Sequence, residues 1–238
     1  MKIALIGYGK MGHMIEGIAL ERGHEIVGII DPTLVNGDCS LVTDFDSEVF
    51  RSADVAIEFT TPATAKENVL RVWAQNVPVV CGTTGWKPEE LVIGDWSFVI
   101  EGSRKVVKDE KGKTMLVWSS NFSVGVNIFF DLNKQLAAAM KAQPQYTPSI
   151  TEIHHIHKLD KPSGTAKTLA EQIENELPSL QGGAGGRLPI ESIREGEVPG
   201  THEVKWDSEE DTIIITHIAK GRRGFALGAV LAAEELKQ

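Results

Sequence analysis

The sequence predicts an α/β protein, with an N-terminal Rossmann-type, doubly wound parallel sheet and a C-terminal α+β domain built on an open mixed sheet. In the first half, short apolar runs of strand type alternate with segments of helical apolar spacing, which is typical of a parallel sheet. From about Thr147 onward, strand-type segments dominate and one helical segment lies among them. We therefore expect two domains, formed by residues 1–122 with 218–238 and by residues 123–217.

The composition limits the partners that the protein can bind. Lys and Arg total 24 and Asp and Glu total 33, so the formal net charge is −9. A surface of that sign does not attract nucleic acid or anionic lipid, so a local cluster of positive groups must hold any anionic ligand. The two cysteines, Cys39 and Cys81, are too few for a disulfide scaffold. No apolar run could span a bilayer, and the N-terminus lacks the pattern of a signal peptide. We expect a cytoplasmic protein with no nucleic-acid partner and no membrane partner.

A glycine motif follows the first expected strand, Lys2–Ile6. It precedes an apolar-periodic helix and consists of Gly7, Tyr8, Gly9, Lys10, Met11 and Gly12. The spacing G-x-G-x-x-G between a strand and a helix is typical of dinucleotide binding, because glycines permit a tight turn and a close approach of the pyrophosphate to the helix N-terminus. The alternative is a tight turn of an α/β fold that binds nothing.

The second expected strand, Glu25–Ile30, ends at Asp31, which lies 19 residues after Gly12. A carboxylate at this position suits hydrogen bonds to ribose hydroxyls and repels a 2′-phosphate. Pro32 and Thr33 follow, so no neighbouring arginine offsets that repulsion. The sequence therefore slightly favours NADH over NADPH.

Three later strand ends supply further candidate residues. The strand Asp54–Phe59 leads into Thr60, the strand Pro78–Cys81 into Gly82, Thr83 and Thr84, and the strand Met115–Trp118 into residues 119–123. Ligands of doubly wound sheets lie at the carboxyl ends of the strands, so we expect Thr60 and the Gly82–Thr84 turn to contact the nicotinamide half of the cofactor. A plain turn is the alternative for Gly82–Gly85. A crossover helix is expected between Glu89 and Lys113, but three glycines interrupt this stretch and part of it is strand-like.

The second half begins with a long helix from Ser123 and continues with strands at 148–156, 190–194, 203–206 and 212–218. One helix, at 166–177, lies between the first two strands. Such an open sheet leaves a broad apolar face, which we expect another subunit to cover. Residues 221–230 open a short helix that can return to the first domain.

Residues 152–166 contain three histidines, two lysines and a Ser-Gly-Thr turn, and they read as strand, loop and helix start. Strand alternation predicts Glu152, His154 and Ile156 on one face and Ile153, His155 and His157 on the other. The three imidazoles then cannot converge on one metal ion, and we expect no metal site.

The helix start that follows is a candidate anion pocket. Ser163 is a favoured N-cap, and the amides of Gly164 and Thr165 begin the helix without intrahelical acceptors. Unpaired donors at the positive end of a helix dipole suit a carboxylate, and Lys158 could bind the same anion or donate a proton. The alternative is an ordinary capped helix preceded by a polar strand.

The pattern of residues 152–166 resembles the signature of the dihydrodipicolinate reductases of bacterial and plant lysine biosynthesis. The matching positions are Glu152-x-His154-His155-x-His157-Lys158-x-Asp160-x-Pro162-Ser163-Gly164-Thr165-Ala166. Further matches lie at Gly82–Gly85, Asn121-Phe122-Ser123-x-Gly125-Val126-Asn127, Ile193-Arg194-x-Gly196 with Gly200-x-His202, and Arg222-x-x-Phe225-Ala226-x-Gly228-Ala229. The resemblance implies a homotetrameric enzyme that uses NADH or NADPH to reduce the cyclic product of dihydrodipicolinate synthase, a small dicarboxylate, to tetrahydrodipicolinate.

By position, the resemblance implies that His154 is the acid–base residue and that Lys158 is the proton donor. The substrate carboxylates would be held by His155, Lys158, Ser163, Gly164 and Thr165. The cofactor would be held by Gly7 to Gly12, Asp31, Gly82, Thr83, Thr84, Ser119, Ser120, Asn121 and Phe122. Thr60, at its strand end, and Arg222 are further candidate cofactor residues. Residues 1–122 with 218–238 would then bind the dinucleotide, and residues 123–217 would bind substrate and form the oligomer.

Two other classes of protein remain open. Another two-domain dehydrogenase of amino-acid metabolism, such as an aspartate or homoserine dehydrogenase, would share only the nucleotide domain, and the motif at 152–166 favours the reductase. A dinucleotide-sensing regulator should carry a basic face or a DNA-binding helix, and the net charge of −9 supports neither.

Overall fold

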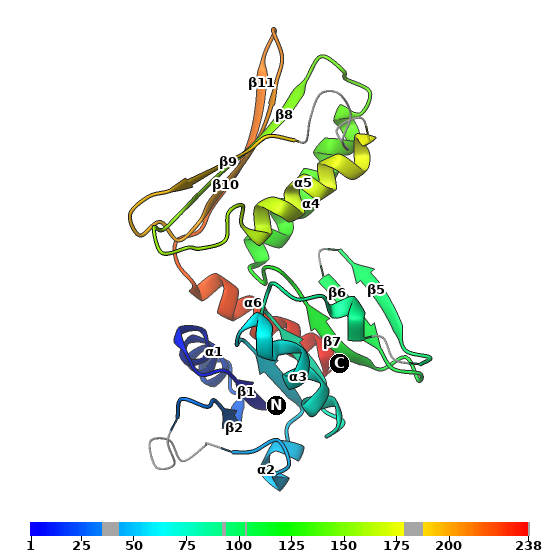
Figure 1. Ribbon diagram of the computed structural model, residues 1–238, viewed down its shortest axis with the longest axis vertical. Helices are drawn as coiled ribbons and strands as arrows, with labels where there is room; N and C mark the ends of the chain where they lie inside the picture. The colour runs from blue at the N-terminus through cyan, green and yellow to red at the C-terminus, as the bar shows by residue number, and fades with distance from the viewer. Residues whose placement is uncertain (35–42, 92–93, 103, 179–187, 238) are drawn as a thin grey trace. The chain divides into compact units, whose positions relative to one another are not determined.

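A computed structural model of the chain describes residues 1–34, 43–91, 94–102, 104–178 and 188–237 (Figure 1). Cys39, expected on a loop, lies outside these residues. The chain forms two compact units: unit 1 comprises residues 1–123 with 223–238, and unit 2 comprises residues 124–222. The sequence expectation placed the second boundary at residue 218, five residues earlier than the structure does.

The sheet of unit 1 has the strand order β2-β1-β3-β4-β7-β6-β5. Its first five strands run parallel and are β2 (Glu25–Ile30), β1 (Lys2–Ile6), β3 (Val55–Glu58), β4 (Val79–Cys81) and β7 (Thr114–Trp118). Strands β1, β3 and β4 are almost entirely buried, as expected when helices cover both faces of a parallel sheet. The prediction of a Rossmann-type sheet is confirmed.

Helices cover both faces of this sheet. One core contains side chains of α1 (Lys10–Glu21) and α6 (Arg223–Leu236), and the other contains side chains of α2 (Glu48–Arg51) and α3 (Pro62–Trp73). Helix α6 can pack closely because Gly228 has no side chain: a Cβ there would lie 1.7 Å from the Phe122 carbonyl oxygen. The C-terminal helix is therefore part of unit 1, and its 14 residues make it longer than the short helix predicted.

The expectation of a crossover helix between Glu89 and Lys113 is wrong. A single 3₁₀ turn, η1 (Pro88–Leu91), is followed by the antiparallel strands β5 (Ser97–Glu101) and β6 (Arg104–Lys108), and β6 pairs with β7. Gly94 and Gly102 have φ of +59° and +63°, which interrupt a helix, and Val106 and Val107 of β6 are buried in the two hydrophobic cores of unit 1. The β-branched residues of this stretch therefore extend the sheet and do not cover it.

Unit 2 contains a four-stranded sheet in the order β11-β10-β8-β9. Strands β8 (Thr147–His154) and β9 (Ile190–Arg194) are parallel, whereas β10 (Thr201–Asp207) and β11 (Thr212–Ile218) are antiparallel to their neighbours. Helices α4 (Val124–Met140) and α5 (Gly164–Glu176) lie side by side and pack on one face of this sheet (Figure 1). The predicted open mixed sheet is confirmed. Among the described residues, no helix is long and apolar enough to cross a membrane.

Candidate functional site

The glycine turn of unit 1 leaves room for a ligand only at its centre. Gly7 has φ of +89°, and a Cβ on it would lie 2.1 Å from the Phe59 carbonyl oxygen. A Cβ on Gly12 would lie 2.4 Å from the Gly7 carbonyl oxygen, so both ends of the turn require glycine. A Cβ on Gly9 would meet nothing within 4 Å. The backbone at Gly9, just before the start of α1, is therefore open to a pyrophosphate, and the turn fits a dinucleotide.

A cavity of about 650 Å³ lies beside this turn. Among the predicted cofactor residues, Gly7, Gly9, Asp31 and Thr60 line it. Asp31 closes the end of β2: its carboxylate accepts hydrogen bonds from the Tyr8 amide (2.6 Å), the Thr33 amide (2.8 Å) and the Thr33 hydroxyl (2.6 Å). Burial acts to raise the pKa of Asp31, but these hydrogen bonds outweigh it and lower the pKa below its usual value. Asp31 is therefore an anion fixed at the edge of the cavity.

An arginine that local sequence reasoning missed also lines this cavity. Arg71 reaches it from α3, and its guanidinium carbon lies 4.1 Å from the centre of the Phe45 ring, which is another lining residue. Arg71 is not a sequence neighbour of Asp31 but lies 40 residues further along the chain, so the local sequence does not indicate it. Both an anion and a cation therefore line the cavity.

The other predicted cofactor residues of unit 1 lie at adjacent strand ends. The Thr60 amide after β3 donates to the Thr83 hydroxyl after β4 (2.8 Å), and the Ser119 amide after β7 donates to the Cys81 carbonyl (3.4 Å). Gly82 fits under the Phe59 ring, where a Cβ would lie 2.1 Å from a ring carbon. The structure thus brings together three turns, which contain Thr60, Gly82, Thr83, Thr84, Ser119, Ser120, Asn121 and Phe122.

Not all of these side chains are accessible. Ser119 and Phe122 are 1% and 2% exposed, and the Ser119 hydroxyl donates to the Asn121 carbonyl (2.8 Å). Tyr8, Lys10 and Met11 lie on the glycine turn and the first residues of α1. Arg222 is exposed at the end of unit 2, immediately before α6. The predicted cofactor residues therefore differ in exposure: some are buried and others are exposed.

The register of the four strands of unit 2 places polar residues in one row across the sheet. Ser192, Glu152, His202 and His217 lie directly opposite one another across β9, β8, β10 and β11. They share a face with the buried core residues Ile150 and Val204, so the row faces α4 and α5. On the same face, His154 is opposite Arg194. Strands far apart in the sequence therefore meet at one buried polar site.

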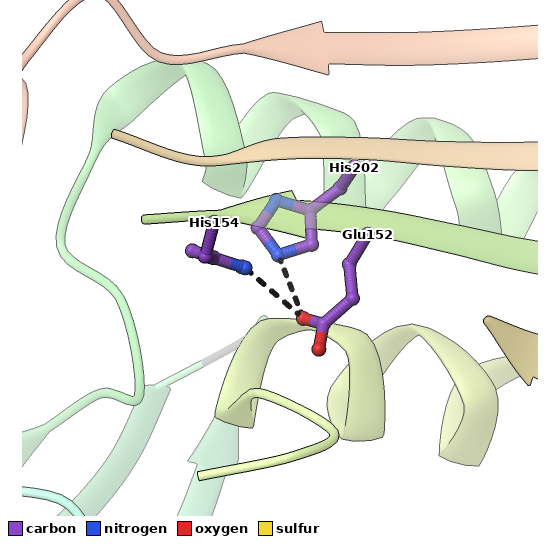
Figure 2. A group of neighbouring side chains, drawn as sticks. All are labelled: Glu152, His154 and His202. Atoms are coloured by element: carbon purple, nitrogen blue, oxygen red, sulfur yellow. Dashed lines mark ion pairs between the residues drawn. The ribbon is translucent and has the colours of Figure 1, made fainter. Parts of the chain in front are cut away.

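Glu152 is at the centre of this site (Figure 2). Its side chain is 0% exposed, and its two oxygens accept the Ser163 amide at 3.0 and 3.2 Å. Nδ1 of His154 and Nε2 of His202 lie 3.4 and 3.7 Å from one oxygen, and an Arg194 nitrogen lies 3.3 Å from the other. Glu152, Arg194 and His202 belong to the motifs that resemble the reductase signature, but sequence reasoning gave them no role.

The predicted helix start is confirmed. Ser163 is the N-cap of α5, and its hydroxyl accepts the Ala166 amide at 3.2 Å. The same hydroxyl lies 3.2 Å from Nε2 of His202. Gly164 and Thr165 are the first residues of the helix, at the positive end of its dipole. The N-terminus of α5 is thus fixed by two side chains of the sheet.

The loop between β8 and α5 carries Lys158. Its ammonium lies 2.8 Å from the Asp160 carboxylate. Arg194 donates to the carbonyl oxygens of Lys158 (3.3 Å) and Asp160 (2.6 Å), and this anchors the loop to β9. The predicted alternation is confirmed for Glu152 and His154, which share the buried face of β8, but it is wrong beyond them, because β8 ends at His154 and residues 155–158 belong to the following loop.

The buried charges set the protonation of the site. Burial lowers the pKa of His154 to about 4; the Glu152 carboxylate opposes this shift, and the Lys158 and Arg194 cations add to it. Burial likewise lowers the pKa of His202 to about 3. For Glu152, burial acts to raise the pKa, but hydrogen bonds from Ser163 and others outweigh it and lower the pKa. At neutral pH the site therefore holds an anionic Glu152 and two neutral imidazoles.

Glu152, His154 and His202 could also hold a metal ion, because each offers a ligand atom within 4.8 Å of the others. His202 lies on β10, far along the chain from the histidines at 154, 155 and 157, so the alternation of one strand does not indicate it. The Glu152 oxygens, however, already accept the Ser163 amide and face the Arg194 guanidinium, which would repel a second cation. The arrangement suits a network that holds side chains and protons in place.

Comparison with known proteins covers the whole chain. Residues 1–122 match the family model described as "Dihydrodipicolinate reductase, N-terminus", and residues 125–238 match the one described as "Dihydrodipicolinate reductase, C-terminus". A 4-hydroxy-tetrahydrodipicolinate reductase of Christiangramia forsetii is 44% identical, with 100% of this chain and 92% of the relative covered. One of Bdellovibrio bacteriovorus is 36% identical, with 95% and 90% covered.

Solved structures show the same fold. A dipicolinate-bound dihydrodipicolinate reductase from Paenisporosarcina sp. TG-14 matches with a TM-score of 0.70 and 22% identity, covering 100% of this chain and 94% of that one. Aspartate semialdehyde dehydrogenase II of Vibrio cholerae matches with a TM-score of 0.54 and 10% identity, covering 99% and 97%. The second likeness extends to the architecture but not to the sequence.

Proposed function

The chain belongs to the dihydrodipicolinate reductase family, and from that premise we propose how its residues carry out the reaction. The activity is that of a 4-hydroxy-tetrahydrodipicolinate reductase: an NAD(P)H-dependent oxidoreductase of lysine and diaminopimelate biosynthesis that forms tetrahydrodipicolinate. The observation that supports the residue assignment is that His154, the Lys158 loop and the capped start of α5 are tied together around one buried carboxylate.

Unit 1 binds the dinucleotide in this proposal. The Gly9 backbone and the start of α1 receive the pyrophosphate, and the Asp31 carboxylate receives the ribose hydroxyls. When bound, the nicotinamide supplies the hydride. The fixed anion at Asp31 disfavours a 2′-phosphate, and Arg71 in the same cavity limits that effect, so we expect NADH to be preferred by a modest factor.

Unit 2 binds the dicarboxylate substrate. The amides of Gly164 and Thr165 at the start of α5 and the Lys158 ammonium receive its carboxylates, with Ser163 and His155 at the edges of the same loop and helix. Lys158 donates the proton that balances hydride addition at the other end of the conjugated system. His154 is neutral in the free enzyme. Two substrate carboxylates nearby would favour its protonated form, so it can act as the acid–base group when substrate is bound.

The open face of the unit 2 sheet is the surface for assembly. Ile214 and Ile218 of β11 are 51% and 67% exposed on it, and the register aligns Ile218 with Thr201, Ile153 and Ile193 across the four strands. Burying such a row against a copy of itself removes apolar surface from water. We therefore assign oligomerisation to unit 2, with a homotetramer as the assembly.

The reaction is tested by following NADH absorbance with substrate made in situ by a coupled dihydrodipicolinate synthase. Lys158→Ala and His154→Ala should each lower kcat by roughly 10²-fold or more, the usual scale for a lost acid–base group, with cofactor affinity little changed. Lys167→Ala, which removes an exposed lysine of α5, is the control and should retain full turnover. Near-normal turnover of either test variant would remove that residue from the chemistry.

The same assay with NADPH measures cofactor preference, and a strong preference for NADPH would contradict the role of Asp31.

A further inference from the structure

Glu152 carries a charge in a place where a neutral side chain would be less costly. It is 0% exposed, and removing a carboxylate from water is unfavourable unless opposite charges and hydrogen bonds compensate. A neutral amide could also accept the hydrogen bond of the Ser163 amide. The hydrogen bond alone therefore does not account for a carboxylate at this position.

The side chains around Glu152 indicate what the charge does. Nδ1 of His154 is buried and makes no hydrogen bond to any described residue, and the nearest carboxylate oxygen of Glu152 lies 3.4 Å away. A carboxylate at that distance favours a proton on Nδ1 and stabilises the ring when it becomes charged. Nε2 is then the nitrogen that exchanges a proton with the substrate.

The same carboxylate is also connected to the Lys158 loop. Arg194 lies between them: one of its nitrogens is 3.3 Å from Glu152, and the guanidinium donates to the carbonyl oxygens of Lys158 and Asp160. An arginine holds such a geometry because its donors form a rigid fork. Glu152 thus links the imidazole, the helix start and the loop that carries the proton donor.

We propose that Glu152 is a positioning residue for the reduction: its ionised carboxylate directs the proton of His154 to Nδ1 and holds the start of α5 and, through Arg194, the Lys158 loop in their working arrangement. This inference rests on the proposed function. It adds a charge requirement to a site that otherwise consists of substrate-binding and proton-transferring groups.

Several other charged and titratable groups also act on His154. Burial and the Lys158 and Arg194 cations lower its pKa, whereas Glu152 and Asp160 raise it. His202 shares the Glu152 oxygen, and its ring centre lies 4.9 Å from that of His154. The groups that surround Glu152 and His154 are therefore Lys158 and Asp160 from the loop, Arg194 from β9 and His202 from β10. His217 from β11 lies beyond His202. Removal of the Glu152 charge leaves cations dominant in this set.

The test compares Glu152→Gln, which removes the charge and keeps the shape, with Glu152→Asp, which keeps the charge on a shorter side chain. Glu171→Gln makes the same chemical change on the exposed face of α5 and is the control. Each full-length variant is assayed for kcat and KM across pH. Dipicolinate binding is followed by calorimetry in buffers of different ionisation enthalpy, which counts the protons taken up on binding without requiring turnover.

Glu152→Gln should lower kcat by roughly tenfold or more and move the pH limb due to His154 toward acid by about one unit or more, because the imidazolium loses its counter-ion. Proton uptake on dipicolinate binding should fall for the same reason. Glu152→Asp should keep the wild-type position of the pH limb due to His154 and the wild-type proton uptake on dipicolinate binding, even where kcat is reduced. Glu171→Gln should match the wild type in every measurement.

Two results would overturn the inference: a Glu152→Gln enzyme with wild-type kcat and pH profile, or Gln and Asp variants equally impaired with the limb unmoved, which would mean that only the shape of Glu152 matters. If Glu152→Gln does not fold, the limb position in Glu152→Asp decides, and a shift of a full unit would reject the charge requirement. A wild-type chain that fails to oxidise NADH with the substrate would instead defeat the proposed function itself.

Discussion

Gly200 lies against the imidazole of His154, and its lack of a side chain lets the ring occupy its place. A Cβ on Gly200 would be 3.1 Å from Nε2 and 3.3 Å from Cδ2 of His154. The backbone φ of +151° also disfavours any other residue. Gly200 therefore restricts the position of the nitrogen that we assign to proton exchange.

Gly200→Ala should move that ring by a few tenths of an ångström and lower kcat by roughly tenfold, since small misplacements of reacting groups are costly. Cofactor binding, which belongs to unit 1, should not change. Gly196→Ala is the matched control, because Gly196 has φ of +48° but a Cβ there would meet nothing within 4 Å. It should lose similar stability and keep kcat, as measured by thermal unfolding and steady-state assay. Equal kcat in both variants would show that contact with His154 is unimportant.

The predictability of the site from sequence differs from residue to residue. The Ser163 cap was predictable because an N-cap depends on residues three positions apart. Glu152 and His154 were recognisable as neighbours on one strand face, since alternation is local. Their contacts with Arg194 and His202 were not predictable, because they depend on the register of β9 and β10 against β8, which no local pattern specifies.

At the scale of elements, β8 combines a core strand with a polar site. Its first buried positions are Pro148 and Ile150, and Ile150 joins the hydrophobic cluster under α4 and α5; its last two, Glu152 and His154, belong to the buried polar site. The strand ends at His154, so the following turn is free to carry Lys158. Because this polar site is buried, the imidazoles of His154 and His202 are held neutral inside unit 2.

Those histidines should make unit 2 sensitive to acid. Their pKa values fall from 6.5 to about 4 and about 3 on folding. At pH values between the unfolded and the folded pKa, the unfolded chain therefore binds more protons than the folded chain. The associated stability is present in full above pH 6.5 and is lost progressively as the pH falls toward the folded pKa values. With 1.36 kcal/mol per pKa unit, each histidine should cost roughly 2 kcal/mol at about pH 5.

Hydrogen exchange of α4 and α5 peptides at neutral and acid pH measures this loss within unit 2. His202→Asn should remove part of the pH dependence, and His157→Gln should leave it unchanged, because that histidine is exposed beside Glu197. A free energy of unfolding that stays level between neutral and acid pH would contradict the neutral state of the buried pair.

At the scale of the whole molecule, the chain leaves one unit and returns to it. Unit 1 is completed by α6, which follows 99 residues of unit 2. The alternation of strands and helices predicted the parallel part of unit 1, since each element carries its own periodicity. The hairpin of β5 and β6 was only partly indicated, by the strand-like part of residues 89–113, because such apolar residues also support a helix and only pairing with β7 decides.

The open face of the unit 2 sheet tests the proposed assembly. Ile218→Glu should place one charge per subunit in a row that we expect to be buried, and since burial of an isoleucine contributes about 1.5–3 kcal/mol, association should weaken by at least tenfold. Analytical ultracentrifugation should show a tetramer for the wild type and smaller species for the variant. Leu20→Glu, at a 55% exposed leucine of α1, is the control and should leave the tetramer intact. A wild-type chain that sediments as a monomer, or a variant that remains tetrameric, would mean that this face is not the interface.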